Sequence, residues 1–267
     1  MKYLYDKQDN VYTPSEHAVG PWGPSALHGG STAGLIGHAL ELASDRDDLQ
    51  FARMTLDMFR PVPLSPLTVE SRIVRDGKRV QIIETTVIGA GKEVAKGTGL
   101  KLCQTDIELP DGLSLSTDTL ADPEQIEAMS MMGSTNSDSL PPGLHYNLQM
   151  KRISGFTAKG EGQAWFHMPV EVVKDMPTTP FVHMCMISDF GNGTGQIYVK
   201  NSMGSINADI SLHLHRVPTT KWIGFDSKTE MQLNGVGIIL TKIYDTKGPL
   251  GHISQCVMPQ MIQSRQS

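Results

Sequence analysis

The 267-residue chain is poor in cysteine and carries no excess of positive charge. Its three cysteines, Cys103, Cys185 and Cys256, are far apart and form no CxxC pair, which argues against a disulfide framework, a zinc site or a redox motif and favours reduced thiols. The net charge is −5, with 28 acidic against 23 basic residues. Because nucleic-acid-binding domains are usually basic, we expect no nucleic-acid partner, although a local Lys/Arg cluster could hold a smaller anion.

Long hydrophobic runs are also missing. No apolar stretch approaches the roughly 20 residues that a membrane-spanning helix requires. The N-terminal segment MKYLYDKQDNVY is charged and polar where a secretory signal would have an apolar core. The sequence therefore predicts a protein without a membrane span, located in the cytoplasm.

The residues that are present are typical of a globular protein with many turns: 39% are hydrophobic, and there are 26 glycines and 16 prolines. Residues 31–43 repeat apolar side chains at helical spacing, and Ser31 or Thr32 can cap the start of such a helix. Strand-like runs divided by turn residues follow at 51–59, 67–74, 80–88 and 94–103. This part of the chain is predicted to be one buried helix followed by an antiparallel meander.

The same order of elements returns later in the chain. A strand is predicted at 164–168 and an apolar helix at 181–190, and further strands follow at 206–215, 222–227, 236–244 and 252–258. Between the two parts, the sequence is polar and rich in Ser, Thr, Asp and Pro, with one short helical candidate at 123–132. We therefore expect an N-terminal domain over 1–109, a linker over 110–142 and a C-terminal domain over 143–267.

A nearly constant offset of 155 or 156 residues supports an internal repeat. The matched pairs are His28 with His183, Arg60 with Arg216, and Lys92 with Lys247. In each half one helix precedes an antiparallel sheet, and the simplest packing wraps the sheet round the helix. The sequence predicts an α+β fold with two such units side by side.

Several motifs mark a family resemblance. In chain order they are HGG at 28–30, FRPVP at 59–63, SDF at 188–190, ADISLHLHR at 208–216 and SQ at 254–255. Together they resemble the double hot-dog thioesterases of the acyl-CoA thioesterase II type over nearly the whole chain. The resemblance implies a tandem hot-dog fold and hydrolysis of fatty acyl-CoA to free acid and CoA, without metal, cofactor or covalent intermediate. It also implies acyl-CoA as the binding partner and allows a homodimer or homotetramer.

The resemblance assigns roles to individual residues. Asp189, Asn207 and Gln255 correspond to the family's catalytic Asp, polar residue and Gln, which surround a nucleophilic water. Two local sequences depart from the family pattern. Asn207 stands where the family usually has Thr or Ser, and Gln255 is followed by Cys-Val-Met instead of Glu-Gly, so Ser254 is an alternative to Gln255.

The chemistry of hydrolysis explains why such residues are needed. A base must activate the water, and a donor must stabilise the carbonyl oxygen as it becomes an oxyanion. Asp189 ends the apolar segment MCMISDF, so we expect burial to raise its pKa; the alternative is a solvent-facing Asp that caps the turn at 191–193. The amides of Asn207 and Gln255 can donate and accept around a water.

His28, Gly29 and Gly30 are the predicted substrate-binding residues. Backbone amides at a helix start are unpaired and lie at the positive end of the helix dipole, so they suit an oxyanion. The two glycines would let the thioester approach them closely. For His28, holding the helix entry by a hydrogen bond is as good an interpretation as a part in catalysis.

The other histidines do not predict a metal centre. His213 and His215 share one strand face, but the sequence fixes no third ligand with them or with His183. No metal site is therefore expected. The main alternative function is a catalytically silent acyl-CoA-binding or lipid-binding hot-dog protein, because two predicted site positions depart from the family. A hot-dog hydratase would need an Asp and His pair in one loop, which is absent from the sequence.

The offset also predicts one competent site per chain. It sets Gly34 opposite Asp189, so the first-half helix has no carboxylate at that position. Conversely, it sets Met184 and Cys185 opposite the two glycines of the first half. A working site would then combine the first-half glycines with the second-half polar residues.

Overall fold

Helix α1 (Gly29–Leu42) begins close to the predicted start of the first helix, with His28 as its N-cap. The computed structural model describes residues 1–21, 23, 25–113, 115–130, 142–200 and 202–261. All residues of α1 from Gly30 to Leu40 are buried. Because this helix has no polar face, the rest of the fold must enclose it. None of the described helices is long and apolar enough to cross a membrane.

Long antiparallel strands cover α1 in the first half of the chain. In sheet order they are β1 (Tyr3–Gln8), β2 (Val11–Pro14), β4 (Leu67–Asp76), β5 (Val80–Gly89), β6 (Lys92–Cys103) and β3 (Leu49–Met58). The short helix η1 (Glu16–Ala18) follows β2. Every second residue of β5 is buried, as expected for a sheet with one face on the core. The predicted strands of this half agree with the structure to within a few residues, but β1 and β2 are additional.

The second half repeats this arrangement in mirror order along the sheet. Its strands are β12 (Asp209–Leu214), β15 (Gly248–Met261), β14 (Gly237–Asp245), β13 (Ile223–Met231), β9 (Glu161–His167), β8 (Gln149–Gly155) and β7 (Met129–Ser130), with β11 (Ser202–Asn207) also paired to β15. The short helices η2 (Pro123–Gln125) and α2 (Leu144–Asn147) precede β8 in the chain. The strand predicted over 206–215 is therefore divided between β11 and β12.

The prediction of one helix over 181–190 is wrong. The structure contains two helices, α3 (Pro180–Ile187) and α4 (Phe190–Thr194), which are separated at Ser188 and Asp189. The Ser188 hydroxyl donates to the Cys185 carbonyl at 2.7 Å, within the last turn of α3. The interruption brings the Asp189 side chain out of the helix line toward α1, where it is used.

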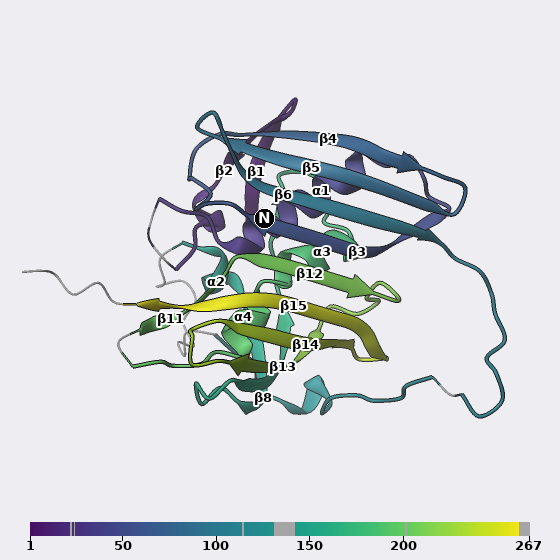
Figure 1. The fold of residues 1–267 in the computed structure, drawn as a ribbon, viewed down its shortest axis with the longest axis vertical. Helices are drawn as coiled ribbons and strands as arrows, with labels where there is room; N and C mark the ends of the chain where they lie inside the picture. The colour runs from purple at the N-terminus through teal and green to yellow at the C-terminus, as the bar shows by residue number, and fades with distance from the viewer. Residues whose placement is uncertain (22, 24, 114, 131–141, 201, 262–267) are drawn as a thin grey trace, which may run out of the picture.

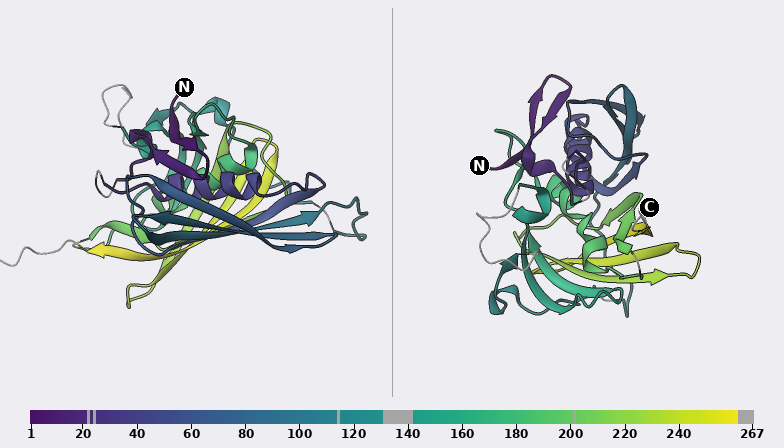
Figure 2. Two further views of the ribbon diagram at one scale, coloured as in Figure 1. Left: turned by 90° about the horizontal axis from the view of Figure 1, so that it is seen from above. Right: turned by 90° about the vertical axis from the view of Figure 1, so that its left-hand side faces the viewer.

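The two halves are joined along the sheet and between the helices. Strands β3 and β12 pair antiparallel, which unites the described strands into one sheet of fifteen (Figure 1). The sheet curves around α1 and the second-half helices (Figure 2). β10 (Glu171–Val173), which belongs to the second half of the sequence, crosses to pair in parallel with β1.

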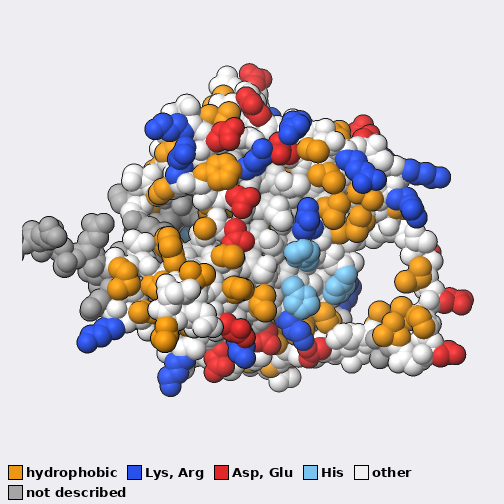
Figure 3. Space-filling view, in the orientation of Figure 1, with side chains coloured by type: hydrophobic (Ala, Val, Ile, Leu, Met, Phe, Trp, Pro, Cys, Tyr) orange, Lys and Arg blue, Asp and Glu red, His pale blue; other side chains and the backbone are white. Residues whose placement is uncertain are grey.

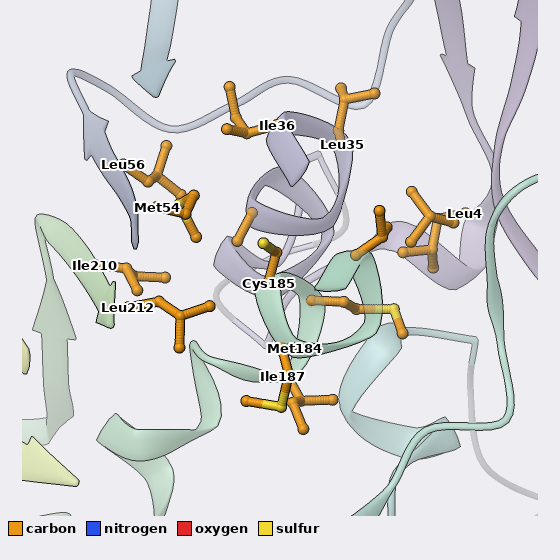
Figure 4. Packing of buried hydrophobic residues seen from close by; sticks show 14 of the residues in the cluster. Leu4, Leu35, Ile36, Met54, Leu56, Met184, Cys185, Ile187, Ile210 and Leu212 are labelled. Carbon is orange, nitrogen blue, oxygen red and sulfur yellow. The ribbon is translucent and has the colours of Figure 1, made fainter. Parts of the chain in front are cut away.

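The helices α1 and α3 lie antiparallel and in close contact at the centre of the molecule. A Cβ atom at Gly37 would lie only 2.8 Å from Cys185 Cβ, so the absence of a side chain lets the helices approach. Strands β3 and β12 contribute buried side chains to the same core, as Figure 4 shows for Met54 and Leu56 on one strand and Ile210 and Leu212 on the other. The core therefore spans both halves.

The internal repeat is real, but its offset differs between strands and helices. β4 and β13 begin 156 residues apart, and so do β6 and β15. By contrast, α1 and α3 begin 151 residues apart, because the connections between helix and sheet differ in length. The expected match of His28 with His183 is therefore wrong. The helical counterpart of Asp189 is His38 and not Gly34.

The described part of 110–142 packs against the second half. The Trp165 indole N–H donates to the Ala121 carbonyl at 2.7 Å, and the Tyr244 hydroxyl donates to Asp118 at 2.9 Å. β7 pairs with β8 at the edge of the sheet. Residues 131–141, which the sequence assigns to the linker, lie outside the described residues. The domain boundaries drawn from the sequence stay a prediction.

Candidate active site

The carboxylate of Asp189 lies at the N-terminus of α1, between the two halves of the chain. Only 8% of this residue is exposed. Its Oδ2 atom accepts a hydrogen bond from the Gly30 N–H at 2.9 Å, and its Oδ1 atom accepts one from Asn207 Nδ2 at 2.9 Å. The amides and the dipole at a helix start favour a negative charge. Asp189 therefore does not face solvent, and it makes no cap hydrogen bond to α4.

His28 completes the set of groups around this carboxylate. Its Nδ1 atom lies 2.9 Å from Asp189 Oδ2 and 3.0 Å from the Gly30 amide nitrogen. An unprotonated Nδ1 would direct its lone pair at the carboxylate, so we assign the proton to Nδ1, which then donates to Asp189. The imidazole stacks on the Phe190 ring at 4.9 Å, which holds its plane.

The pKa of Asp189 is lowered, contrary to the expectation from the sequence. Burial is the largest influence and acts to raise the pKa, as expected for a desolvated carboxyl group. The hydrogen bonds from His28, Asn207 and Gly30 outweigh it, since each stabilises the charged form. Asp189 is therefore a carboxylate at neutral pH, held ionised by donors that come from both halves.

A second histidine lies next to His28. The rings of His28 and His145 stack at 5.9 Å, and His145, in α2, is buried. Burial lowers the pKa of His145 to about 4, and the nearby His28 lowers it further. His145 is therefore neutral, which leaves His28 as the titratable imidazole beside Asp189. The sequence gave no motif that could have identified His145.

Asn207 is held in one orientation by a residue that sequence reasoning missed. Asn192, in α4, donates through Nδ2 to the Ser205 carbonyl at 2.9 Å and to Asn207 Oδ1 at 3.3 Å. The Ser205 hydroxyl in turn donates to Asn192 Oδ1 at 2.7 Å. With Oδ1 of Asn207 occupied by a donor, its Nδ2 faces the Asp189 carboxylate.

Gln255 lies beneath α4 but does not contact Asp189 by a hydrogen bond. It is 1% exposed, and neither atom of its amide has a hydrogen-bond partner among the described residues. A Cβ atom on Gly191 would lie 2.6 Å from Gln255 Oε1, so the amide is directly under the first turn of α4. Ser254, the alternative, points to the opposite face of β15, because side chains alternate along a strand.

The space at the two glycines is filled by the protein itself. A Cβ atom on Gly29 would lie 2.7 Å from Asp189 Oδ2, and one on Gly30 would lie 2.5 Å from the Met186 carbonyl oxygen. The glycines thus allow Asp189 and α3 to approach, and the Gly30 N–H is already bonded to Asp189. Of the two amides, only the Gly29 N–H makes no hydrogen bond to a described residue.

The pseudo-equivalent position in the other half is built differently. His38 takes the place of Asp189; it is buried, and burial lowers its pKa to about 4. Phe181 and Phe51 take the places of Gly30 and Asn207, and their rings stack at 4.1 Å. This cleft therefore contains stacked rings and no carboxylate that corresponds to Asp189.

The histidines considered as metal ligands are not brought together. His213 and His215 are exposed on the outer face of the sheet, whereas His183 lies in α3 beside His167, with 6.5 Å between the rings. Within the described ranges no group of His, Cys, Asp and Glu side chains has a geometry that could hold a metal ion.

Two comparisons with known proteins bear on this geometry. Residues 18–101 match the family model for the acyl-CoA thioesterase N-terminal domain, and residues 123–258 match the model for the C-terminal domain. No curated protein matches the chain. Solved structures match over nearly the whole length at low identity, which shows a shared fold.

Three of these structures illustrate the likeness. An acyl-CoA thioesterase II from Mycobacterium marinum is 16% identical, with a TM-score of 0.67 over 98% of this chain and 96% of that chain. A hot-dog protein from Alicyclobacillus acidocaldarius is 13% identical, with a TM-score of 0.69 over 97% and 96%. A TesB protein from Mycobacterium avium is 11% identical, with a TM-score of 0.65 over 96% and 95%. The chain is a double hot-dog protein that belongs to the acyl-CoA thioesterase family.

Proposed function

We propose that the protein hydrolyses fatty acyl-CoA to a free acid and CoA, with Asp189 as the base for a nucleophilic water. The observation that carries this proposal is the buried Asp189 carboxylate at the start of α1, held by His28, Gly30 and Asn207. A carboxylate fixed by three donors is ionised and immobile before substrate arrives. Such a group can orient a water and accept its proton in the transition state.

The hydrogen bonds indicate which carboxylate oxygen meets the water. Oδ2 of Asp189 accepts from both His28 and Gly30, whereas Oδ1 accepts only from Asn207. Oδ1 therefore keeps a lone pair for the water. Because the donors lower the pKa, Asp189 is a weak base, and it works chiefly by aligning the water and taking the proton as the new bond forms.

The reaction then proceeds in two steps. The water oxygen attacks the thioester carbon as its proton moves to Asp189, which yields a tetrahedral oxyanion. The C–S bond breaks, the carbonyl forms again, and the proton passes from Asp189 to the sulfur of the departing CoA. We assign the oxyanion donor to the Gly29 N–H, since the Gly30 N–H serves Asp189.

Gln255 acts as the second group that positions the water. A buried amide with two unsatisfied atoms is costly, and buried polar groups of this kind usually bind water or ligand. Its place beneath α4, next to the residue two positions after Asp189, supports a role in this site. Asn207 in turn fixes the carboxylate.

The remaining features of the proposal follow from the same residues. The substrate is acyl-CoA, no metal or cofactor takes part, and each chain has one working site. Described cysteines are all free thiols, which agrees with the cytoplasmic location expected from the sequence. The alternative, a catalytically silent binding protein, is favoured by one observation: Asp189 is already engaged by three donors.

Turnover separates the two functions. Released CoA thiol should be measured for the parent protein and for Asp189→Asn with acyl-CoA of several chain lengths. We expect turnover by the parent and a loss of roughly 100- to 10,000-fold in the variant, since a general base is removed. Asp57→Asn, an exposed carboxylate on β3, is the matched control and should keep the parent rate. Binding without thiol release in the parent would refute hydrolysis, and equal rates in Asp189→Asn would refute Asp189 as the base.

A further inference from the structure

The outer face of the sheet carries an ordered pattern of charge across β3, β12, β15 and β14. Register pairs place Arg53 beside His213, His213 beside His252, and His252 beside Lys242. These side chains alternate with the buried residues of each strand and point away from the core. We call this line of basic and imidazole groups the basic row. Figure 3 shows histidines gathered in the middle of this face, next to Lys or Arg.

Two residues further along the strands lies a row of small hydroxyl side chains. Thr55 pairs with Ser211, and Ser211 pairs with Ser254. All three are partly buried. After two more residues an acidic row follows, in which Asp57 pairs with Asp209. Adjacent rows are about 7 Å apart, given a rise of roughly 3.4 Å per residue.

Several of these charges are not neutralised within the chain. Neither Arg53 nor Asp57 forms an ion pair with a described residue, and Arg53 Nε is a buried donor without a partner among them. Lys96 is the cross-strand neighbour of Asp57, but its Nζ pairs with Glu84 at 3.1 Å. A buried guanidinium N–H without an acceptor is costly, so an acceptor from outside the chain would stabilise it.

We infer that this face binds a second copy of the same chain. A twofold axis that lies along the hydroxyl row and in the plane between two facing sheets exchanges the basic row with the acidic row. Arg53 of one copy then faces Asp57 of the other, and His213 faces Asp209. Each contact occurs twice, as in any interface between identical surface patches.

The shape and composition of the face favour this arrangement over other orientations. The hydroxyl row meets itself, and its small side chains let two sheets approach to about 10 Å, the usual distance for face-to-face packing. An axis along the strand direction would instead place Arg53 against His252, which is unfavourable. Exposed Leu240 and Ile238 on β14 continue the hydroxyl and acidic rows and add apolar area.

Charge reversal tests the pairing directly. Sedimentation equilibrium of the full chain should show a monomer–dimer equilibrium that weakens as salt is raised. Arg53→Asp and Asp57→Arg each place like charges across the axis, so each should weaken association by about tenfold or more. The double variant, Arg53→Asp with Asp57→Arg, restores opposite charges and should return association to within about threefold of the parent.

Glu108→Arg, an exposed change of the same charge away from the face, is the control and should associate like the parent. Far-UV circular dichroism establishes that each variant is folded. A parent that stays monomeric at every concentration would overturn the inference. So would Asp57→Arg associating as well as Glu108→Arg, or a double variant no better than the single ones.

Discussion

The carboxylate of Asp189 and the backbone N–H of Gly30 are hydrogen-bonded at 2.9 Å although they are 159 residues apart in the chain. One comes from the break between two second-half helices and the other from the start of the first-half helix. Neither half alone contains both partners. The proposed site therefore exists only because α1 and α3 pack against each other.

The unsatisfied amide of Gln255 leads to a prediction in which stability and activity change in opposite directions. In Gln255→Met the side chain keeps its volume and loses a buried amide, so the free energy of unfolding should stay equal or rise by about 1 kcal/mol. Turnover should fall by roughly tenfold or more, since a group that positions the water is lost. Urea unfolding and thiol release measure the two effects.

Gln81 provides the matched control. It is also fully buried, but Gln81 Oε1 accepts from Ser44 at 2.8 Å and its Nε2 donates to Asp76 at 3.2 Å. Gln81→Met should lower stability and leave turnover unchanged. If Gln255→Met were the destabilised variant, or turned over at the parent rate, Gln255 would be an ordinary core residue.

Asn192 should act through Asn207 and not on the substrate. In Asn192→Ala the Asn207 amide loses the donor to its Oδ1 atom and can rotate, so kcat should fall by about fivefold to tenfold while KM stays within about twofold. Ser205→Ala removes one hydrogen bond to Asn192 but leaves its Nδ2 contacts, and its kcat should remain near that of the parent. Steady-state kinetics test this; equal losses in both variants would indicate general loosening of β11.

One bound ligand per chain is expected. The pseudo-equivalent cleft is filled by the stacked rings of Phe51 and Phe181, so it has no room for an acyl thioester. Calorimetric titration with a non-hydrolysable thioether analogue of acyl-CoA should give a stoichiometry near one, in the parent and also in Asp189→Asn, which keeps its cleft. Two equivalent ligands per chain would show that the second cleft opens.

The buried carboxylate of Asp245 predicts how stability depends on pH. Burial acts to raise its pKa, but the ion pair with Arg216 and the backbone amides of Thr219 and Lys247 lower it to about 2. Because the folded pKa lies below the unfolded value of about 3.9, ionised Asp245 stabilises the fold above pH 4, and this contribution is lost as the pH falls toward 2.

Comparison with Asp245→Asn isolates that contribution. The parent should be more stable than the variant at pH 7, and the difference in unfolding free energy should shrink between about pH 4 and pH 2. Urea unfolding at a series of pH values provides the measurement, and Asp106→Asn, which is exposed, is the control. A difference that is constant with pH would mean that Asp245 contributes by shape and not by charge.

Much of the fold could be predicted from the sequence because it depends on local patterns. Alternating apolar residues in β5 and β14 and the turn residues between them are visible without any tertiary information. The family motifs added the tandem hot-dog arrangement, which the structure confirms. Short edge strands such as β1 and β10 carry no such pattern and could not be found.

The properties of the proposed site were harder to predict because they depend on distant partners. Local sequence shows that Asp189 follows an apolar segment, which suggests a raised pKa, but the donors that lower the pKa come from His28, Gly30 and Asn207. The repeat offset failed in the helices for a related reason: connections of unequal length between helix and sheet leave no mark in apolar periodicity. The stacking of Phe51 on Phe181 likewise depends on the packing of the two halves.

The parallel pairing of β1 with β10 has a consequence for how the chain is made. Tyr3 lies beside Glu171, so the first sheet is incomplete until residues far into the second half have been synthesised. Contacts between such distant residues form slowly, because a long loop must close before they contribute. On the ribosome the N-terminal strand must therefore wait, unpaired on that edge, until β10 has emerged, and the two halves complete their folding together.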